Sequence, residues 1–453
     1  MLSLRMGTQK KHYKFGAKVI KAVAGAGILI KGAVVLTQDS QRKVLRNCDI
    51  LIEGSRIAKV AKGVKEKAEF VLNARNKIAM PGLVNAHTHA AMSLFRGLAD
   101  DMTFWEAWPG TVWPRERKLK ARHVLAGARL AMLEMIRSGT TCFADFYFFP
   151  EQTARAAREL GLRACVGSDV QDGRTPHARN AKEAIALSER FIKKFRNDSL
   201  ISPVAYAHAP YTCSAETMLK VRELAEKYDV RMHTHLSETR KEVFELKKKT
   251  GMRPVEYIEK IGFLCSRLAA AHCAWMTKSE VSMLARAKAS VVHCPVSNMK
   301  LASGGAAPVP EMVAAGVNVA LGTDGPASNN SLDMFDTMKF AALLHKNWRW
   351  DPRAVPAQVA LDFATLGGAR SLGVDAGSLE EGRLADIVLL DLNSPNLAPL
   401  ADIPSLLVYS ANPSNVTDVI VNGRMLMRDG RMWANAENIL RQARKAAVEL
   451  AGA

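Results

Sequence analysis

The chain has 453 residues and a mass of 49.5 kDa, with 48% hydrophobic and 24% charged residues. This composition is ordinary for a globular protein and excludes collagen-like, coiled-coil and wholly disordered chains. No stretch approaches 18 uncharged apolar residues, so we expect no membrane-spanning helix and no membrane partner. The net charge of +19 favours anionic partners or adds solubility, but beyond the first 25 residues it is diffuse, and we expect no nucleic-acid partner.

Residues 1–25 are predicted to be a basic N-terminal tail. They hold six Lys and Arg residues, and the first acidic residue of the chain is Asp39. The tail lacks the continuous apolar core of a secretory signal. The seven cysteines of the chain form no Cys-X-X-Cys pair, which is typical of reduced thiols. We therefore expect a cytoplasmic protein.

The two ends of the remaining chain are rich in short β-strands. Residues 26–80 and 376–435 alternate apolar and polar positions around turns such as Glu53-Gly54 and Asn422-Gly423. Such alternation with Gly-containing turns predicts hairpins. We expect the two segments to be the two parts of one small β-sandwich domain, followed by a C-terminal helix over 436–453.

The middle of the chain, residues 81–375, alternates apolar strands with helical stretches. Residues 121–137 carry apolar side chains at helical spacing, and Gly139 is placed to end that helix. Eight β/α units in this length predict a (β/α)8 TIM barrel. An open doubly wound sheet is the alternative, but the chain has no GxGxxG after the first strand and no Walker A sequence. The predicted strands are Leu83–His89, Thr140–Phe146, Arg163–Val170, Val204–Ala209, Val230–Leu236, Leu268–Trp275, Ser290–Val296 and Val317–Thr323.

Candidate metal ligands end several of these strands, at the face where such barrels carry their active sites. His87 and His89 are two residues apart, so both side chains point to the same face of the first strand. His235 ends the fifth strand and Asp324 follows the eighth. Three neutral imidazoles and one carboxylate suit Zn²⁺, with Fe²⁺ as the alternative ion. The competing interpretation is a set of histidines hydrogen-bonded in a barrel core.

Glu238 lies three residues beyond His235 and just past the strand end. At this distance a carboxyl group stands beside the metal without binding it, as a proton shuttle should. Taken alone, a glutamate after a strand is more often a solvated residue at a helix start. The neighbouring His235 favours the catalytic interpretation.

Several of these segments together resemble the amidohydrolase superfamily. They are PGLVNAHTH at 81–89, HLSE at 235–238, AHC at 271–273 and LGTDG at 321–325. Three further segments are similar to the branch that deaminates 5′-methylthioadenosine and S-adenosylhomocysteine, with its 5′-deoxyadenosine-acting relatives. These are MSLFRGLADD at 92–101, APYTC at 209–213 and GPASNNS at 325–331. The resemblance covers about residues 27–435 and implies a metal barrel with a composite β-sandwich.

The resemblance also implies the site. It gives His87, His89, His235 and Asp324 as ligands of one metal ion, because His208 stands on the fourth strand where binuclear members have a bridging lysine. Glu116 is implied to bind the ribose hydroxyls, and Arg174 to reach the distal part of the substrate, with Arg179 close behind. A tryptophan should pack on the purine or the 5′ substituent; Trp105 and Trp108 compete, and we choose Trp108. A homo-oligomer is also implied.

The expected reaction is hydrolytic deamination of a 5′-substituted adenosine to the corresponding inosine. Asp324 would take the proton of the attacking water, His272 would direct that water, and Glu238 would protonate the ring nitrogen. His208 would contact the substrate, a small-molecule nucleoside. The alternatives are guanine or cytosine deamination, a triazine-type hydrolysis, or a catalytically silent barrel that serves as a scaffold.

Overall fold

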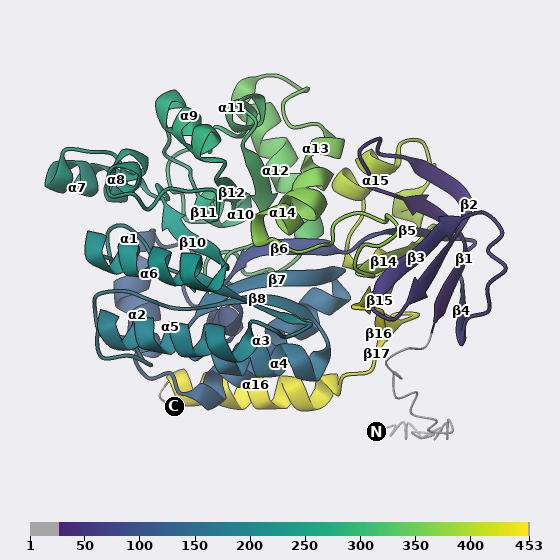
Figure 1. Cartoon of the computed structure of the whole chain (residues 1–453), viewed down its shortest axis with the longest axis horizontal. Coiled ribbons are helices and arrows are strands. Elements are labelled where there is room, and N and C mark those ends of the chain that lie inside the picture. The colour runs from purple at the N-terminus through teal and green to yellow at the C-terminus, as the bar shows by residue number, and fades with distance from the viewer. Residues whose placement is uncertain (1–26, 452–453) are drawn as a thin grey trace, which may run out of the picture.

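The computed structural model describes residues 27–451, which form a barrel and a second sheet beside it (Figure 1). The predicted basic tail, residues 1–25, lies outside the described residues. No helix within the described part of the chain is long and apolar enough to cross a membrane.

The barrel consists of eight parallel strands that follow one another in chain order around the sheet. Each strand overlaps one of the eight predicted ranges, which confirms the predicted barrel. Between the first and last strands, the Asp324 N–H donates to the His87 carbonyl at 3.0 Å, and the Asn85 side chain bonds to Thr323. The barrel is therefore nearly closed. The strands are β6 (Leu83–Thr88), β7 (Thr140–Tyr147), β8 (Arg163–Ser168), β9 (Ile201–Tyr206), β10 (Arg231–Leu236), β11 (Leu268–His272), β12 (Ser290–His293) and β13 (Asn318–Leu321).

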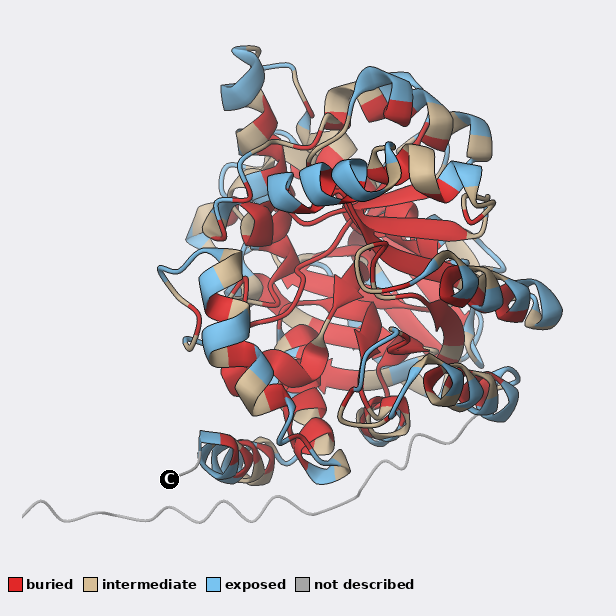
Figure 2. Cartoon of the chain, turned by 90° about the vertical axis from the view of Figure 1, so that its left-hand side faces the viewer, coloured by how far each residue is buried: buried red, intermediate tan, exposed pale blue. Residues whose placement is uncertain are grey.

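Helices surround the barrel, with their buried faces turned to the strands and their exposed faces outward (Figure 2). The helix predicted over 121–137 is α3 (Ala121–Arg137), and Gly139 follows it with a φ of +80°. The others are α4 (Pro150–Leu160), α5 (Ala181–Phe195), α6 (Ala215–Tyr228), α7 (Arg240–Thr250), α8 (Pro254–Lys260), α9 (Lys278–Ala287), α10 (Pro295–Lys300), α11 (Val309–Ala314), α12 (Met334–Arg349), α13 (Ala357–Asp362), η3 (Phe363–Gly367) and α14 (Gly368–Leu372).

Short helices cover the open end of the barrel after β6. They are η1 (Ala90–Phe95), α1 (Phe104–Ala107), η2 (Trp108–Val112) and α2 (Trp113–Glu116). The loop before α1 is tied to α10, because Lys300 Nζ donates to Asp100 Oδ1 at 2.6 Å and to Asn330 Oδ1 at 3.1 Å. The segments after β6, β12 and β13 are thus joined above the barrel.

The second sheet is built from both ends of the chain, as the sequence predicts. Its nine strands run in the order β17-β16-β15-β14-β5-β1-β2-β3, and β4 pairs with β1. The two halves meet where β14 lies antiparallel to β5, with Ile387 opposite Pro81. The strands are β1 (Ile28–Leu36), β2 (Val44–Glu53), β3 (Arg56–Ala61), β4 (Phe70–Asn73), β5 (Lys77–Pro81), β14 (Ile387–Asp391), β15 (Val416–Val421), β16 (Arg424–Arg428) and β17 (Arg431–Met432).

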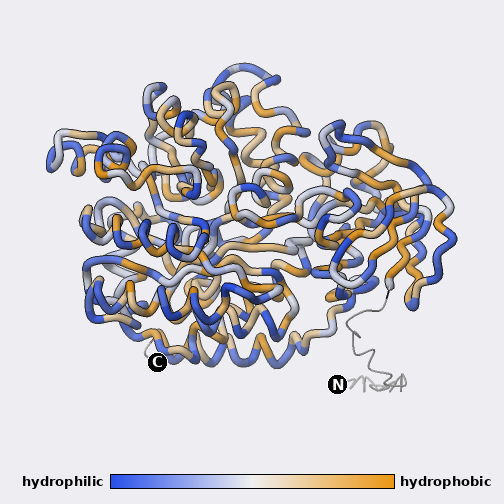
Figure 3. The backbone as a smooth tube through the Cα atoms, in the orientation of Figure 1, coloured by the Kyte–Doolittle hydropathy of each residue, from blue (hydrophilic) through white to orange (hydrophobic). Residues whose placement is uncertain are grey.

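The remaining helices of the C-terminal part are η4 (Pro395–Leu397), α15 (Ile403–Tyr409), η5 (Pro413–Asn415) and α16 (Ala436–Ala451). Helix α16 returns along the barrel and lies against α3, where His123 Nε2 is 2.9 Å from Glu449 Oε2 (Figure 1). Apolar residues concentrate on the strands and on the inner helix faces, and polar residues on the outside (Figure 3). This core holds the strand ends in fixed positions.

Candidate active site

The predicted metal ligands converge at the C-terminal end of the barrel. Strand β6 carries His87 and positions His89 one residue beyond its end, β10 carries His235, and Asp324 follows β13. The Nε2 atoms of His89 and His235 are 3.2 Å apart. Asp324 Oδ1 lies 3.4 Å from Nε2 of both His87 and His89. Residues from three strands therefore surround one small space.

These distances fit a single tetrahedral ion. With metal–ligand bonds of roughly 2.0–2.1 Å, the ligand atoms around zinc lie about 3.3 Å apart. His87 Nε2 is buried and has no hydrogen-bond partner among the described residues. Burial lowers the pKa of His87 to about 4 and holds the pKa of His235 well below its usual range. Both imidazoles are therefore neutral near pH 7, as metal ligands must be.

The second nitrogen of each ring is held by the protein. His89 Nδ1 lies 2.7 Å from the Phe146 carbonyl oxygen, and His235 Nδ1 lies 2.8 Å from that of His208. His87 Nδ1 lies 2.9 Å from Nε2 of His233, which stacks on Phe146 deeper in the barrel. Such partners fix the ring orientation and tautomer of a ligating histidine.

Asp324 is held by hydrogen bonds from three sides. The hydroxyls of Ser297 and Ser328 each donate to Oδ2 at 2.7 Å, and the Gly325 N–H donates to Oδ1 at 2.7 Å. Burial alone would raise the pKa of this carboxyl, but the neighbouring imidazoles of His87, His272 and His89 hold the pKa well below its usual range. Asp324 is therefore ionised and can accept a proton while it faces the ligand histidines.

Glu238 and His272 stand next to this group. Glu238 Oε2 is 3.8 Å from His272 Nε2, and His272 Nδ1 is 3.2 Å from the Asn298 amide. Burial and the neighbouring charge of Asp324 raise the pKa of Glu238 to about 8. Glu238 is therefore protonated at neutral pH and can donate a proton.

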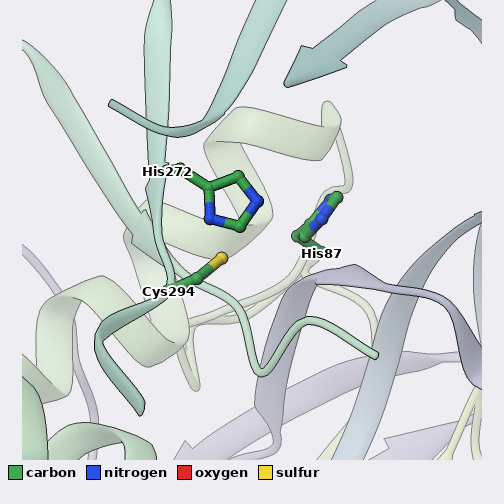
Figure 4. A group of neighbouring side chains, drawn as sticks. All are labelled: His87, His272 and Cys294. Carbon is green, nitrogen blue, oxygen red and sulfur yellow. The ribbon is translucent and has the colours of Figure 1, made fainter. Parts of the chain in front are cut away.

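A cysteine that the sequence did not single out also lies near these histidines. Figure 4 shows Cys294, the residue after β12, with its sulfur turned toward His272 and His87. Burial raises the pKa of the Cys294 thiol well above its usual range. A protonated thiol is a poor ligand, so the set of His87, His89, His235 and Asp324 is the better metal site.

A cavity of about 330 Å³ opens above the ligands, and all four predicted substrate-binding residues line it. Trp108 lines the cavity, whereas Trp105 does not. The Trp108 ring stacks on Phe104, with the ring centroids 4.6 Å apart. Arg174 lies at the exposed rim, whereas Arg179 pairs with Glu183 away from the cavity. The lining residues that the sequence analysis missed include Tyr147, Asp169, Gln171 and Trp113.

Glu116 and His208 both line the cavity. The Tyr147 hydroxyl donates to Glu116 Oε1 at 2.7 Å, and burial raises the pKa of Glu116 to about 7. His208 Nδ1 lies 2.8 Å from the Thr212 hydroxyl, and burial lowers the pKa of His208 to about 3. The cavity lining thus offers a carboxyl acceptor and a neutral imidazole.

Several known proteins are similar to this chain in sequence and in fold. The model of the amidohydrolase family matches residues 78–426. The chain is 44% identical over 430 residues to a 5′-deoxyadenosine deaminase of Methanosarcina barkeri, covering 94% of this chain and 98% of the relative. It is 42% identical over 416 residues to a 5-methylthioadenosine/S-adenosylhomocysteine deaminase of Thermodesulfovibrio yellowstonii, covering 90% and 94%. The solved structure of an adenosine deaminase from Xanthomonas campestris with bound zinc superposes with a TM-score of 0.92 at 35% identity, covering 94% of this chain and 99% of that one.

Proposed function

Because the chain belongs to the amidohydrolase family, we propose that it is a zinc-dependent deaminase of 5′-substituted adenosines. The substrates are 5′-deoxyadenosine, 5′-methylthioadenosine and S-adenosylhomocysteine, and the products are the corresponding inosines and ammonia. One observation carries this proposal above the others. A protonated Glu238 and an ionised Asp324 face the same cavity, beside three histidines that are spaced for one zinc ion.

In this proposal His87, His89, His235 and Asp324 hold the zinc ion. When bound, zinc supplies a water molecule acidic enough to attack at neutral pH. Asp324 would accept the proton of the attacking water, and His272, held by Asn298, would direct that water. Glu238 donates its proton to the ring nitrogen next to the amino-bearing carbon, which makes that carbon electrophilic. A second proton transfer then lets ammonia leave.

The cavity wall supports a nucleoside as the substrate. Glu116 has one oxygen bonded to Tyr147, and Oε2 is left without a protein partner among the described residues, so it can accept from ribose hydroxyls. Trp108 offers an apolar face for the purine or the 5′ substituent, and His208 contacts the base side. Arg174 at the rim reaches the distal part of a longer 5′ substituent.

The experiment is a substrate panel with purified, zinc-supplemented protein. Ammonia release and the ultraviolet shift are followed with 5′-deoxyadenosine, 5′-methylthioadenosine, S-adenosylhomocysteine, adenosine and guanine. We expect turnover of the 5′-substituted adenosines that stops on chelation and returns with zinc. Turnover of guanine alone would point to the alternative chemistry of the family, and would overturn the substrate assignment.

We also propose a homo-oligomer that works in the cytoplasm. All seven cysteines are free, which suits a reducing compartment. Phe340, Leu343, Trp348 and Trp350, on and just after α12, are exposed, with Trp350 at 95%. Exposed apolar side chains in one region favour association. Light scattering should give a mass that is a multiple of 49.5 kDa, and a monomer mass would contradict the oligomer.

A further inference from the structure

The loop that carries Glu238 makes a sharp turn between β10 and α7. Ser237, at the turn, has a φ of +52°, in the left-handed region that non-glycine residues rarely adopt. The carboxyl group of Glu238 accepts no hydrogen bond among the described residues, and its Oε2 lies 3.8 Å from His272 Nε2. Side-chain contacts therefore do not fix the direction of Glu238, which depends on the backbone of this loop.

Glu242, in the first turn of α7, holds that backbone. Its Oε1 accepts from the Ser237 N–H at 2.9 Å, and its Oε2 accepts from the Glu238 N–H at 2.8 Å and the Thr239 N–H at 3.4 Å. The Glu242 side chain is buried, with 2% of its residue surface exposed. One buried carboxylate thus fixes three consecutive amides, including that of Glu238 itself.

Helix capping alone does not require this arrangement. In a capping box the glutamate at the third helical position bonds to the N-cap residue only, which here is Thr239. Glu280 in α9 shows the ordinary case, because it caps Thr277 at 2.8 Å and pairs with Arg253, and it is equally buried. Glu242 also bonds to the two residues before the N-cap, which are Ser237 and the proton-carrying Glu238.

We propose that Glu242 is a positioning residue of the deamination, which holds residues 237–239 and so directs the Glu238 carboxyl toward the substrate. This inference rests on the proposed function. Glu242 does not line the cavity, so it acts through Glu238 and not on substrate binding. Misplacing a reacting group by about 1 Å costs up to roughly 100-fold in rate.

The test compares Glu242→Gln with Glu280→Gln, a matched control in which an equally buried capping glutamate is changed. The amide nitrogen of the glutamine cannot accept from a backbone N–H, so the loop loses one anchor. We expect kcat to fall about 10- to 100-fold with Glu242→Gln, with KM within about 2-fold and zinc content unchanged. Glu280→Gln should lower Tm but leave kcat as it is. A kcat equal to that of the wild type, or an equal fall in both variants, would overturn the proposal.

A double variant tests whether Glu242 acts through Glu238. If it does, adding Glu242→Gln to Glu238→Gln lowers kcat no further, because the group that it positions no longer donates a proton. An additive fall would contradict the positioning role. Should Glu242→Gln fail to fold, Glu242→Asp keeps the charge but shortens the reach, and the same fall in kcat at constant KM is expected, with a wild-type kcat overturning the proposal.

Amide hydrogen exchange separates this inference from the proposed function. Exchange at residues 237–239 should become faster in Glu242→Gln and remain unchanged in Glu280→Gln. Unchanged exchange in both variants would overturn the inference whatever the activity. A wild-type protein that turns over no nucleoside would instead remove the proposed function on which the inference rests, and so overturn the positioning role in deamination.

Discussion

Glu238 and Asp324 are two carboxyl groups in one cavity that carry opposite protonation states. Asp324 accepts hydrogen bonds from two serines and a backbone amide, which favour its charged form. Glu238 accepts none among the described residues, and burial next to Asp324 raises its pKa to about 8. Environments that push two carboxyl pKa values apart assign a base and an acid. The proposed roles of the two residues follow from this difference.

Replacing Glu238 with glutamine tests whether Glu238 is the general acid of the reaction. The amide keeps the size of the side chain but cannot donate a proton to the ring nitrogen with the same ease. We expect kcat to fall by about 10²- to 10⁴-fold, the usual contribution of a general acid. Zinc content, measured by elemental analysis, should stay as in the wild type. Full activity with the metal retained would rule out Glu238 as the proton donor.

Glu116 should show a pH-dependent cost in stability. Burial raises its pKa from 4.5 to about 7, so the cost is absent below pH 4.5, where the carboxyl is protonated in both states. This loss of stability grows as the pH rises from 4.5 to about 7, and it is fully present above pH 7. Glu116→Gln should therefore increase the free energy of unfolding at pH 8, by up to about 3 kcal/mol, and change it little at pH 4.5.

The same variant should weaken nucleoside binding, because a charged acceptor for the ribose hydroxyls is lost. We expect kcat/KM for 5′-deoxyadenosine to fall about 10- to 100-fold, from hydrogen bonds to a charged group worth about 1.5–3 kcal/mol. Urea unfolding at the two pH values and steady-state kinetics check the two effects. Equal stability changes at both pH values would contradict the raised pKa.

Single residues differed in how well the sequence predicted them. The convergence of His87, His89 and His235 could be predicted because these residues end apolar strands that alternate regularly with helices, and their role as metal ligands stays a prediction. Tyr147 and Asp169 could not, because each is a lone polar residue at a strand end with no spacing partner, and only the fold brings them to the cavity. The sequence favoured Trp108 over Trp105 without a clear spacing argument, and the structure places Trp108 in the cavity lining.

At the scale of elements, the close packing of η1 on α3 supports the ligands. Gly127 in α3 has no side chain, and a Cβ built there would lie 2.5 Å from the Ala91 carbonyl oxygen. The Ser93 hydroxyl donates to the Gly127 carbonyl at 2.7 Å and joins the two helices. Since η1 begins directly after His89, this contact holds one ligand of the predicted metal site in place.

Gly127→Ala should therefore be harmful although alanine favours a helix by about 1 kcal/mol. The added methyl group pushes η1 away from α3 and moves His89. We expect a lower Tm and a lower zinc content per chain, measured by thermal unfolding and elemental analysis. Gly173→Ala is the control, because a Cβ at Gly173 meets nothing within 4 Å. A Tm above that of the wild type would contradict the packing argument.

The eight strands could be predicted from apolar runs, but several of their ends could not. The run Leu268–Trp275 continues past the strand, which ends at His272 because His272 and Cys273 adopt φ values of +70° and +50°. Apolar patterns do not reveal such turns. The short elements α1, η2 and α2 were not predicted either, because segments of four or five residues carry no readable period.

For the whole molecule, a buried ion pair fastens the barrel to the second sheet. Arg163, at the start of β8, bonds to Asp386 just before β14, with Nε to Oδ2 at 2.7 Å and Nη2 to Oδ1 at 3.0 Å. Both side chains are almost fully buried. The sequence predicted that both chain ends join one β unit, whereas this pair joins residues 223 positions apart and leaves no local signal. The domain boundaries at residues 25, 80, 375 and 435 stay predictions.

Removing Asp386 should destabilise the molecule without changing the chemistry. Asp386→Ala leaves a buried, unpaired Arg163, a change that costs about 3–5 kcal/mol. Asp375→Ala is the matched control, because the Arg56–Asp375 pair is about half exposed and surface pairs contribute about 1 kcal/mol or less. We expect kcat below the transition to be unchanged in both variants. If Asp386→Ala lowers the free energy of unfolding no more than Asp375→Ala does, the Arg163–Asp386 pair does not fasten the barrel to the second sheet.

The most direct test of the metal-dependent deaminase is ammonia release measured while zinc is titrated into chelator-treated protein. One site made of His87, His89, His235 and Asp324 predicts that release from 5′-deoxyadenosine rises linearly with zinc and reaches a plateau at one ion per chain. Release that needs two ions per chain, or that continues without any metal, would contradict this assignment.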